Sequence, residues 1–489
     1  MSSMTGADAS PAQQAMYFVQ QLAPGSHAYN VGVAGRTRAR VDVEALTRAL
    51  QALWERHSQL RATFELGAHG VRQRVATDGA VAFQRRAVEG LSEQELEARV
   101  LAEARRPFDL RSGPLFRATL FSRAEEDHVL LLGLHHLVTD LWSLATLLEE
   151  LGTLYAAFRQ GLEPALPPAG REYSELMAEQ EARLAGREGE RLRSYWMEQL
   201  AGELVPVPLP MAAPRPAQRA LRGATVSFRL EEALTSQLRA LAEAEGSLPL
   251  FLPLMAAFQV LLHRVSGQED VLVSTPVHGR DRRELRGVVG LFLNPVPLRS
   301  RLSGGLSFRE VLRRLQLTLR GALRHWSFPF HRLAELKGAS ARTALAQAQF
   351  VFQSLGRSDD DTVGPFIAGQ PGARLPCGGL ELEALYLPLE EGQFELQLIA
   401  YPVGGALSCQ LKYDTELFEA ATAEALATAY VAVLEAAARE PERRLEDFSV
   451  QLPSRPATGA SSEVQVEAMS DEEVDAMLKQ LVSAQQGRE

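Results

Sequence analysis

Two adjacent histidines and an aspartate are the residues of this chain whose types and spacing point most directly to chemistry. His135 and His136 stand at the end of the apolar run His128–Leu134, and Asp140 follows just before an amphipathic segment. A neutral imidazole can take a proton from an amine or an alcohol, because its unperturbed pKa lies near neutral pH. The pattern His-His-x-x-x-Asp therefore points to general-base chemistry at the end of a strand.

Two other interpretations fit the same histidines. A buried core histidine beside an exposed one would give this pattern about as often as a catalytic pair would. The pattern alone therefore does not decide between these two interpretations. A zinc site is less favoured, because adjacent residues of a strand point to opposite faces and His135 and His136 would not chelate together. We also find no further His or Cys pair at metal-ligand spacing.

The elements that must position these residues are predicted from hydrophobic periodicity. In the first part of the chain we expect helices over 44–54, 93–106 and 144–158, and strands over 63–66, 71–75, 116–122 and 128–134. The run before His135 is almost entirely apolar, which favours a strand buried on both faces. Together these elements predict an α/β lobe over residues 1–175.

A charged helical stretch over 172–203 and a proline-rich connector over 204–220 lead to a second lobe, predicted over 176–452. There we expect strands over 224–230, 270–275 and 349–353, helices over 233–244, 248–264, 308–322 and 420–437, and a hairpin formed by Phe394–Tyr401 and Ala406–Tyr413. Two α/β lobes in tandem suggest a ligand site in a cleft between them.

Composition excludes several classes of protein. The 489 residues are 46% apolar and 23% charged, with a net charge of −10, which is typical of a globular protein and argues against a nucleic-acid partner. We predict no signal peptide and no membrane span. Cys377 and Cys409 offer neither a disulfide framework nor a metal site, which fits a reducing cytoplasm.

The C-terminal segment 453–489 is predicted to be a flexible linker followed by a short amphipathic helix over 470–483. Ser470 and Glu473 have the spacing of a capping box, and apolar residues follow at helical spacing. A helix this short is marginal in water, so its apolar stripe needs a partner. The body of the protein and another chain are equally good candidates.

Several further segments, taken with the histidine pattern, resemble the motifs of nonribosomal peptide synthetase condensation domains, in the family's order and spacing over residues 10 to about 450. They are Ser10-Pro-Ala12-Gln13, Arg56-His57-Ser-Gln-Leu60-Arg61-Ala-Thr63-Phe64, Thr275-Pro-Val-His-Gly279-Arg280, Gly290-Leu-Phe292-Leu-Asn294, Pro329-Phe330 and Arg342-Thr-Ala-Leu345 with Phe350. For His325 and Arg342 themselves, packing is the favoured interpretation.

The resemblance implies two chloramphenicol-acetyltransferase-like lobes in a V-shaped pseudo-dimer with a tunnel between them. It implies a floor loop and a bridging hairpin in the C-terminal lobe. A carrier-bound acyl thioester and an acceptor would enter from opposite ends. His136 would be the catalytic residue, while His135 and Ser143 would support it. By the same resemblance Asp140 would pair with Arg56, so that Arg56→Ala would not fold.

The tunnel and its floor would involve Leu141, Trp142, Gly290, Asn294 and Arg280. Leu141 departs from the family, which usually has glycine there, so we expect it to narrow the space or redirect the turn. The aspartate that the family has before Arg342 is also missing. These departures leave open which donor and acceptor fit.

The sequence thus predicts a stand-alone cytoplasmic condensation enzyme that transfers an acyl group from an acyl or peptidyl carrier protein to an amine or hydroxyl acceptor, small or carrier-bound. We expect no metal and no bound cofactor, with phosphopantetheine supplied by the carrier, and a possible docking partner for the helix 470–483. The alternatives are a noncatalytic carrier-recruiting module and a coenzyme A-dependent acyltransferase; an epimerase of this fold is also possible, although its characteristic segment is not recognisable.

Overall fold

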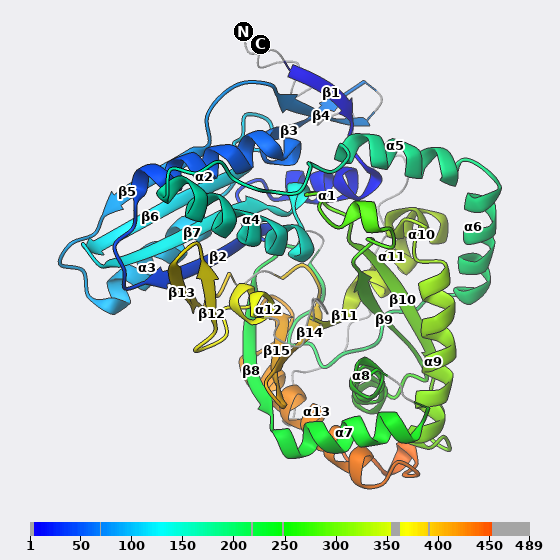
Figure 1. Ribbon diagram of the computed structural model, residues 1–489. Coiled ribbons are helices and arrows are strands. Elements are labelled where there is room, and N and C mark those ends of the chain that lie inside the picture. Colours follow the sequence, from blue (N-terminus) through cyan, green and yellow to red (C-terminus); the bar gives the residue numbers. More distant parts are fainter. Residues whose placement is uncertain are drawn as a thin grey trace.

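The computed structural model describes residues 4–68, 70–216, 219–246, 249–353, 362–389 and 392–451, and these form a mixed α/β protein. Figure 1 shows two lobes: the blue and cyan N-terminal lobe lies at the upper left, and the green to orange C-terminal lobe lies at the lower right. Each lobe is built on a six-stranded sheet. The predicted pair of α/β lobes is confirmed.

The sheet of the N-terminal lobe has the order β12-β13-β2-β7-β6-β5. Its strands are β2 (Asn30–Thr37), β5 (Ala82–Ala87), β6 (Phe116–Ala124), β7 (Asp127–His135), β12 (Arg374–Cys377) and β13 (Leu380–Leu385). Helices α2 (Val43–Arg56), α3 (Glu93–Ala104) and α4 (Leu141–Arg159) cover it.

Strand β7 is buried along its whole length, as its apolar run predicts. Its side chains alternate between two cores. Leu130, Leu132 and Leu134 pack with the residues of α2 and α4, whereas Val129 and Leu131 pack with those of α3. This double burial fixes the end of β7, where the two histidines stand.

A small three-stranded sheet in the order β1-β4-β3 lies beside helix α1 (Pro11–Leu22). Its strands are β1 (Met4–Asp8), β3 (Ala62–Gly67) and β4 (Gly70–Ala76). We expected β3 and β4, but β1 and α1 were not predicted as regular elements. Ser10 caps α1 in a capping box with Gln13.

The sheet of the C-terminal lobe has the order β10-β9-β11-β14-β15-β8. Its strands are β8 (Gly223–Leu230), β9 (Asp270–Val277), β10 (Asn294–Arg301), β11 (Ala348–Phe352), β14 (Leu396–Val403) and β15 (Ala406–Asp414). The helices that follow β8 in the chain are α7 (Glu232–Ala244), α8 (Phe251–Ser266), α9 (Phe308–Arg324), α10 (Phe330–Lys337), α11 (Ala339–Gln347), α12 (Val363–Ile367) and α13 (Ala420–Arg439). Of these, α12 packs against the N-terminal lobe.

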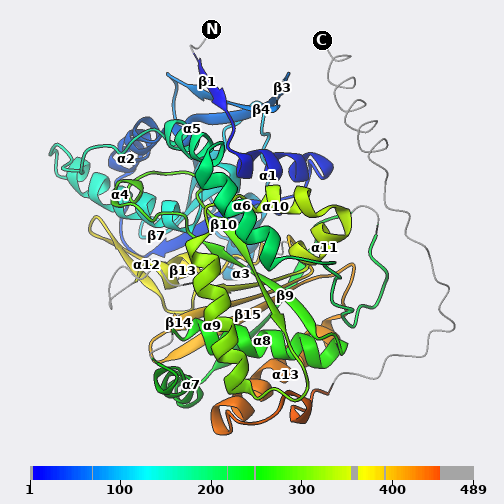
Figure 2. The same ribbon diagram turned by 90° about the vertical axis from the view of Figure 1, so that its right-hand side faces the viewer.

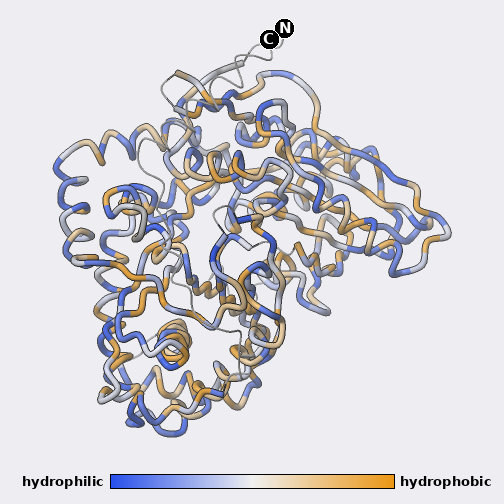
Figure 3. The backbone as a smooth tube through the Cα atoms, turned by 180° about the vertical axis from the view of Figure 1, so that it is seen from behind, coloured by the Kyte–Doolittle hydropathy of each residue, from blue (hydrophilic) through white to orange (hydrophobic). Residues whose placement is uncertain are grey.

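Helix α8 is the centre of the C-terminal core. Every residue from Leu252 to His263 is buried, and the helix is mostly orange in the hydropathy view from behind (Figure 3). Helix α13 packs against α8 and, by length and composition alone, could cross a membrane, which the sequence analysis did not recognise. Its buried residues, such as Leu426 and Tyr430, belong to the same core, so packing explains its apolar character.

Two features of the organisation were not predicted from the sequence. The stretch 172–203 contains two helices, α5 (Tyr173–Leu184) and α6 (Arg187–Gln199), because Gly186 takes an extended conformation between them. These two helices run down one side of the molecule from the N-terminal to the C-terminal lobe (Figures 1 and 2).

The boundary between the lobes is also not a single point in the sequence. The predicted hairpin 394–413 is β14–β15 and stays within the C-terminal sheet. A different hairpin, β12–β13, crosses over and pairs with β2, and α12 packs beside it. Residues 363–385 therefore complete the N-terminal lobe. The linker and tail helix expected over 453–489 lie outside the described residues.

Candidate active site

The turn that carries the histidines begins where β7 ends at His135. A single 3₁₀ turn, His136–Val138, follows, and Asp140 then caps α4 by accepting a hydrogen bond from the backbone N–H of Ser143 at 2.8 Å. Asp140 is a good N-cap because its carboxylate satisfies an N–H group that has no partner within the helix. Strand β7 before His136 and the capped start of α4 after it therefore fix the main chain on both sides of His136.

His135 is buried and structural. Its Nδ1 accepts a hydrogen bond from the backbone N–H of Leu137 at 3.1 Å, so the proton of the neutral ring sits on Nε2. Burial, assisted by the neighbouring His136, lowers the pKa of His135 to about 3. The ring remains neutral and its hydrogen bond to Leu137 stabilises the turn.

His136 is the only side chain of the His-His-x-x-x-Asp pattern that solvent reaches. Its backbone N–H donates to the carbonyl of Tyr29 at 2.8 Å, which fixes the main chain. Its Nδ1 is buried and has no hydrogen-bond partner within the described residues. The backbone therefore fixes the position of His136, while the residue as a whole is partly exposed.

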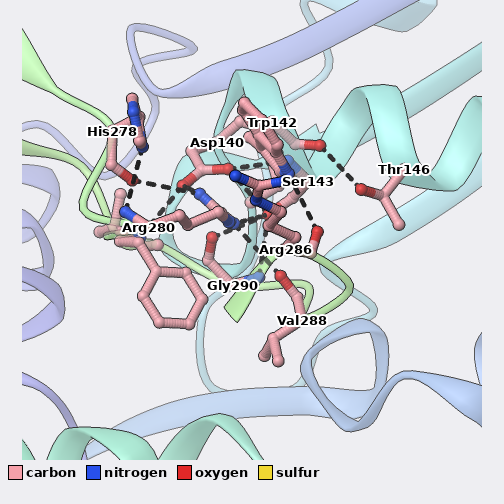
Figure 4. A network of polar contacts seen from close by, with 12 residues as sticks. Asp140, Trp142, Ser143, Thr146, His278, Arg280, Arg286, Val288 and Gly290 are labelled. Atoms are coloured by element: carbon pink, nitrogen blue, oxygen red, sulfur yellow. Dashed lines mark hydrogen bonds and ion pairs between the residues drawn. The ribbon is translucent and has the colours of Figure 1, made fainter. Parts of the chain in front are cut away.

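Asp140 pairs with Arg280, which comes from the other lobe (Figure 4). Arg280 donates to Asp140 Oδ2 at 2.6 Å and to Ser143 Oγ at 2.8 Å, and its guanidinium lies over the ring of Phe292. Burial alone would raise the pKa of Asp140, but the charge and hydrogen bond of Arg280 and the bonds from Ser143 lower it overall. Asp140 is therefore ionised and fully engaged.

The predicted pair of Asp140 and Arg56 is wrong. Arg56 lies at the end of α2 and binds Glu150 of α4 at 3.1 Å, and His57 binds the same carboxylate at 2.7 Å. Four arginines stand in the segments that resemble the family's motifs, namely Arg56, Arg61, Arg280 and Arg342, and the pairing depends on which one the chain path brings to the start of α4. That residue is Arg280, which the sequence analysis had placed at the tunnel floor.

Ser143 and Gly290 join the two lobes beside Asp140 (Figure 4). The Ser143 hydroxyl lies 2.9 Å from the Gly290 carbonyl and accepts from the Gly290 N–H at 3.0 Å. A Cβ on Gly290 would lie 2.3 Å from the ring of Tyr173, so glycine is required by this close approach. Ser143 thus links the start of α4 to the C-terminal lobe, and its support of the site stays a prediction.

Trp142 and Leu141 begin α4 at the same junction. The Trp142 indole N–H donates to the carbonyl of Arg286 at 2.9 Å, and its ring stacks on His278. Leu141 is half-buried and packs against the N-terminal core. Among the described non-glycine residues only Leu221 has a positive φ, so Leu141 replaces the family's glycine without backbone strain. Its effect on substrate space stays a prediction.

Asn294 is bound by the backbone that follows α9. Its amide nitrogen donates to the carbonyls of Trp326 and Phe328, and its oxygen accepts from the N–H of Phe330. These bonds hold the segment 326–330 against the start of β10. A place on a tunnel floor stays a prediction for Asn294.

Two residues that contact the site, Gln13 and Tyr173, were not predicted from the sequence. Gln13 is buried in α1 and donates to the carbonyl of Leu137, the residue after His136, at 2.9 Å. It stands in a segment that had matched the family, and that was the available signal. Tyr173 contacts Gly290 from α5, and nothing in its local sequence distinguished it.

A cavity of about 870 Å³ lies on the N-terminal lobe, lined by α1, the end of β3 and residues 107–111. The ring of Phe108 on its wall also contacts the ring of His135. Its lining contains no residue of the C-terminal half, so this cavity is not the predicted tunnel between the lobes. The described residues contain no group of three or more His, Cys, Asp or Glu that could hold a metal.

Comparison with known proteins agrees with this geometry. The family model for the condensation domain matches residues 5–455. One linear gramicidin synthase of Brevibacillus parabrevis is 34% identical over 88% of this chain, and chondramide synthase of Chondromyces crocatus is 34% identical over 90%. The chain spans only 6% and 11% of these two relatives.

Solved structures show the same fold. A four-domain nonribosomal peptide synthetase bound to AMP and glycine has a TM-score of 0.83 at 25% identity, covering 92% of this chain and 34% of that one. The X-domain from teicoplanin biosynthesis has a TM-score of 0.81 at 26% identity, covering 91% and 97%. By sequence, fold and site geometry, this chain belongs to the condensation domain family of nonribosomal peptide synthetases.

Proposed function

We propose that this chain transfers an acyl group from a carrier-protein thioester to an amine or hydroxyl acceptor, with His136 acting on the acceptor. The observation that carries this proposal is the different state of the motif's side chains. His135 and Asp140 are buried and each accepts a hydrogen bond, whereas His136 is partly exposed, so its imidazole is the one that a substrate can reach.

In the proposed reaction the acceptor nitrogen or oxygen attacks the thioester carbonyl. A C–N or C–O bond forms, the C–S bond breaks, and the phosphopantetheine thiol leaves with the proton that the acceptor gives up. His136 would carry that proton from the nucleophile to the leaving sulfur. No oxidant, nucleotide or metal enters this balance.

The acceptor decides how much His136 must do. A neutral amine is already a good nucleophile, so for amide formation positioning by His136 can supply most of the effect. An alcohol must lose its proton, so ester formation requires a base. The two acceptors therefore make different demands on His136, and offering each of them in the test below distinguishes them.

We further propose that the donor arrives on a separate acyl or peptidyl carrier protein in the cytoplasm, its phosphopantetheine reaching His136 between the lobes. Leu141, Trp142 and Asn294 would line that path. Cys377 and Cys409 are buried free thiols, and burial raises the pKa of each to about 12, so both are unreactive.

The test is to load candidate carrier proteins with acyl-phosphopantetheine and follow acyl loss by intact-protein mass spectrometry after adding an amine or an alcohol. We expect transfer by the wild type and by His325→Ala, whose histidine lies at the end of α9, and loss of transfer by His136→Ala. Equal rates for wild type and His136→Ala would contradict the proposal. Acyl-coenzyme A offered in place of the carrier tests the coenzyme A alternative.

A noncatalytic carrier-recruiting module is the second candidate. It is favoured by the likeness to the teicoplanin X-domain, which has also been solved as a complex with OxyB, at 26% identity to this chain. The presence of His136 opposes it. Carrier binding without acyl transfer, identical in wild type and His136→Ala, would establish this second function.

A further inference from the structure

Tyr173, the first residue of α5, lies outside every motif that matched the family, yet its hydroxyl touches two segments of the active-site region. It lies 2.8 Å from the carbonyl oxygen of Leu291 and 3.0 Å from Ser10 Oγ. Its side chain is buried, with 2% exposed. Burial raises the pKa of the phenol well above its usual value, so the hydroxyl keeps its proton.

Because the hydroxyl has a single proton, it can donate only one of these two hydrogen bonds and must accept the other. A carbonyl oxygen can only accept, so the Tyr173 hydroxyl donates to Leu291 and accepts from the Ser10 hydroxyl. Ser10 Oγ in turn accepts from the backbone N–H of Gln13 at 3.3 Å. Each atom therefore has a defined role, and Tyr173 links α1 with the loop of the C-terminal lobe that precedes β10.

From Ser10 the hydrogen bonds continue to the catalytic turn. Gln13 accepts from the Ser10 N–H through its side-chain oxygen and donates to the carbonyl of Leu137 at 2.9 Å. Leu137 is the residue directly after His136. This arm therefore holds the C-terminal side of His136.

From Leu291 the path also returns to the turn. The next residue, Phe292, donates its backbone N–H to Asp140 Oδ2 at 3.1 Å. Asp140 follows the 3₁₀ turn that contains Leu137. The hydrogen bonds and the short stretches of backbone between them form a closed loop, the Tyr173 circuit. Its members are all buried: Ser10, Gln13, Leu137, Asp140, Tyr173, Leu291 and Phe292.

We propose that Tyr173 is a positioning residue for His136, because its hydroxyl closes a buried circuit that sets the catalytic turn against the C-terminal lobe. The role rests on the proposed function of His136. Without the hydroxyl, α1 and the Leu291 loop lose their shared anchor, and the turn can shift relative to a substrate bound between the lobes. A displacement of about 1 Å can cost up to about a hundredfold in rate.

Tyr173→Phe tests the hydroxyl alone, since the ring that packs edge-on against Phe292 remains. Tyr430→Phe is the matched control: Tyr430 is equally buried and donates to the carbonyl of Leu254 at 3.1 Å, inside the C-terminal core. Both variants lose one buried hydroxyl, so we expect similar small decreases in melting temperature. Only Tyr173→Phe is expected to lower kcat, by about tenfold, while KM is unchanged.

A second readout does not require condensation activity. Diethyl pyrocarbonate modifies accessible neutral imidazoles, and peptide mass spectrometry gives the rate at His136. We expect Tyr173→Phe to change this rate by about threefold or more, and Tyr430→Phe to leave it as in the wild type. Equal kcat and equal His136 modification rates in the two variants would overturn the proposal. If the wild type transfers no acyl group, the proposed function fails and the modification rate alone decides.

Should Tyr173→Phe not fold, Ser10→Gly breaks the same circuit. Glycine caps a helix nearly as well as serine, so α1 is retained while Oγ is lost. Ser92→Gly is its control, because Ser92 caps α3 in an equivalent capping box with Glu95 away from the turn. The proposal requires that Ser10→Gly alter the kcat or modification rate of His136, and that Ser92→Gly leave both unaltered.

Discussion

Asp140 and Arg280 form a buried ion pair of 2.6 Å between the two lobes, directly beside the turn that carries His136. The aspartate caps α4 in the N-terminal lobe, and the arginine follows β9 of the C-terminal lobe. Burying either charge without the other would strongly destabilise the folded chain. The pair therefore couples the geometry of the turn that carries His136 to the relative placement of the lobes.

Removing Arg280 is expected to destabilise the protein far more than removing Arg56. Arg280→Met leaves the Asp140 carboxylate buried without its cation, which typically costs about 3–5 kcal/mol of unfolding free energy. Arg56 is partly exposed, and Glu150 keeps His57 as a partner when Arg56 is replaced. Arg56→Met should therefore fold, and urea unfolding measures both. Insoluble Arg56→Met beside stable Arg280→Met would contradict this assignment.

His135 is expected to make stability depend on pH. Its pKa is about 3 in the folded chain and near 6.5 when unfolded, so the unfolded state binds the proton first. The contribution of His135 is complete above about pH 6.5 and is lost as the pH falls towards 3, by at most about 1.4 kcal/mol per pH unit. Urea unfolding at pH 7 and pH 5 should show a smaller loss for His135→Asn than for the wild type. Equal losses of unfolding free energy in the two proteins would contradict the prediction that His135 causes the pH dependence.

Gly290→Ala is expected to lower the melting temperature, because the new methyl group would lie 2.3 Å from the Tyr173 ring. Overpacking of this kind usually costs about 1–3 kcal/mol. Gly287→Ala is the control in the same loop, since no atom lies within 4 Å of its Cβ position. In thermal unfolding, Gly290→Ala should have a clearly lower melting temperature than Gly287→Ala. Equal melting temperatures would contradict the prediction.

Leu141→Gly is expected to widen the range of acceptors or donors, since it removes a side chain at the start of α4 without requiring a new backbone conformation. The ratio of kcat/KM for a bulky acceptor to that for a small one should rise, while the dependence on His136 remains. An unchanged ratio would mean that Leu141 faces only the core against which it packs.

Deletion of residues 454–489 is expected to leave the melting temperature unchanged while weakening carrier-supplied turnover or association with a partner protein. The physical reason is the capped amphipathic helix predicted over 470–483, whose apolar stripe needs a second surface. Isothermal titration with candidate partners, run on full-length and shortened chains, checks this. Identical affinity and turnover with every partner would remove the docking role.

The sequence alone determined where the His-His-x-x-x-Asp pattern lies, at the end of β7, and most regular elements. The apolar run before His135 predicted the buried strand β7, and the period of Leu147, Leu151 and Tyr155 predicted α4, because burial on one or two faces leaves a local pattern. Similar patterns identified α2, α8 and the hairpin β14–β15. The order of the motif-like segments was sufficient to identify the family.

The tertiary structure alone decided which distant residues meet. Asp140 could have paired with any of several arginines in the motif-like segments, and the chain path rather than a local pattern brings Arg280 to it across 140 residues. For the same reason the sequence did not show that β12–β13 crosses to the N-terminal sheet, or that Tyr173 touches Ser10 and Leu291. Ion pairs and buried hydroxyl contacts depend on relative positions in space, and hydrophobic periodicity carries no information about those positions.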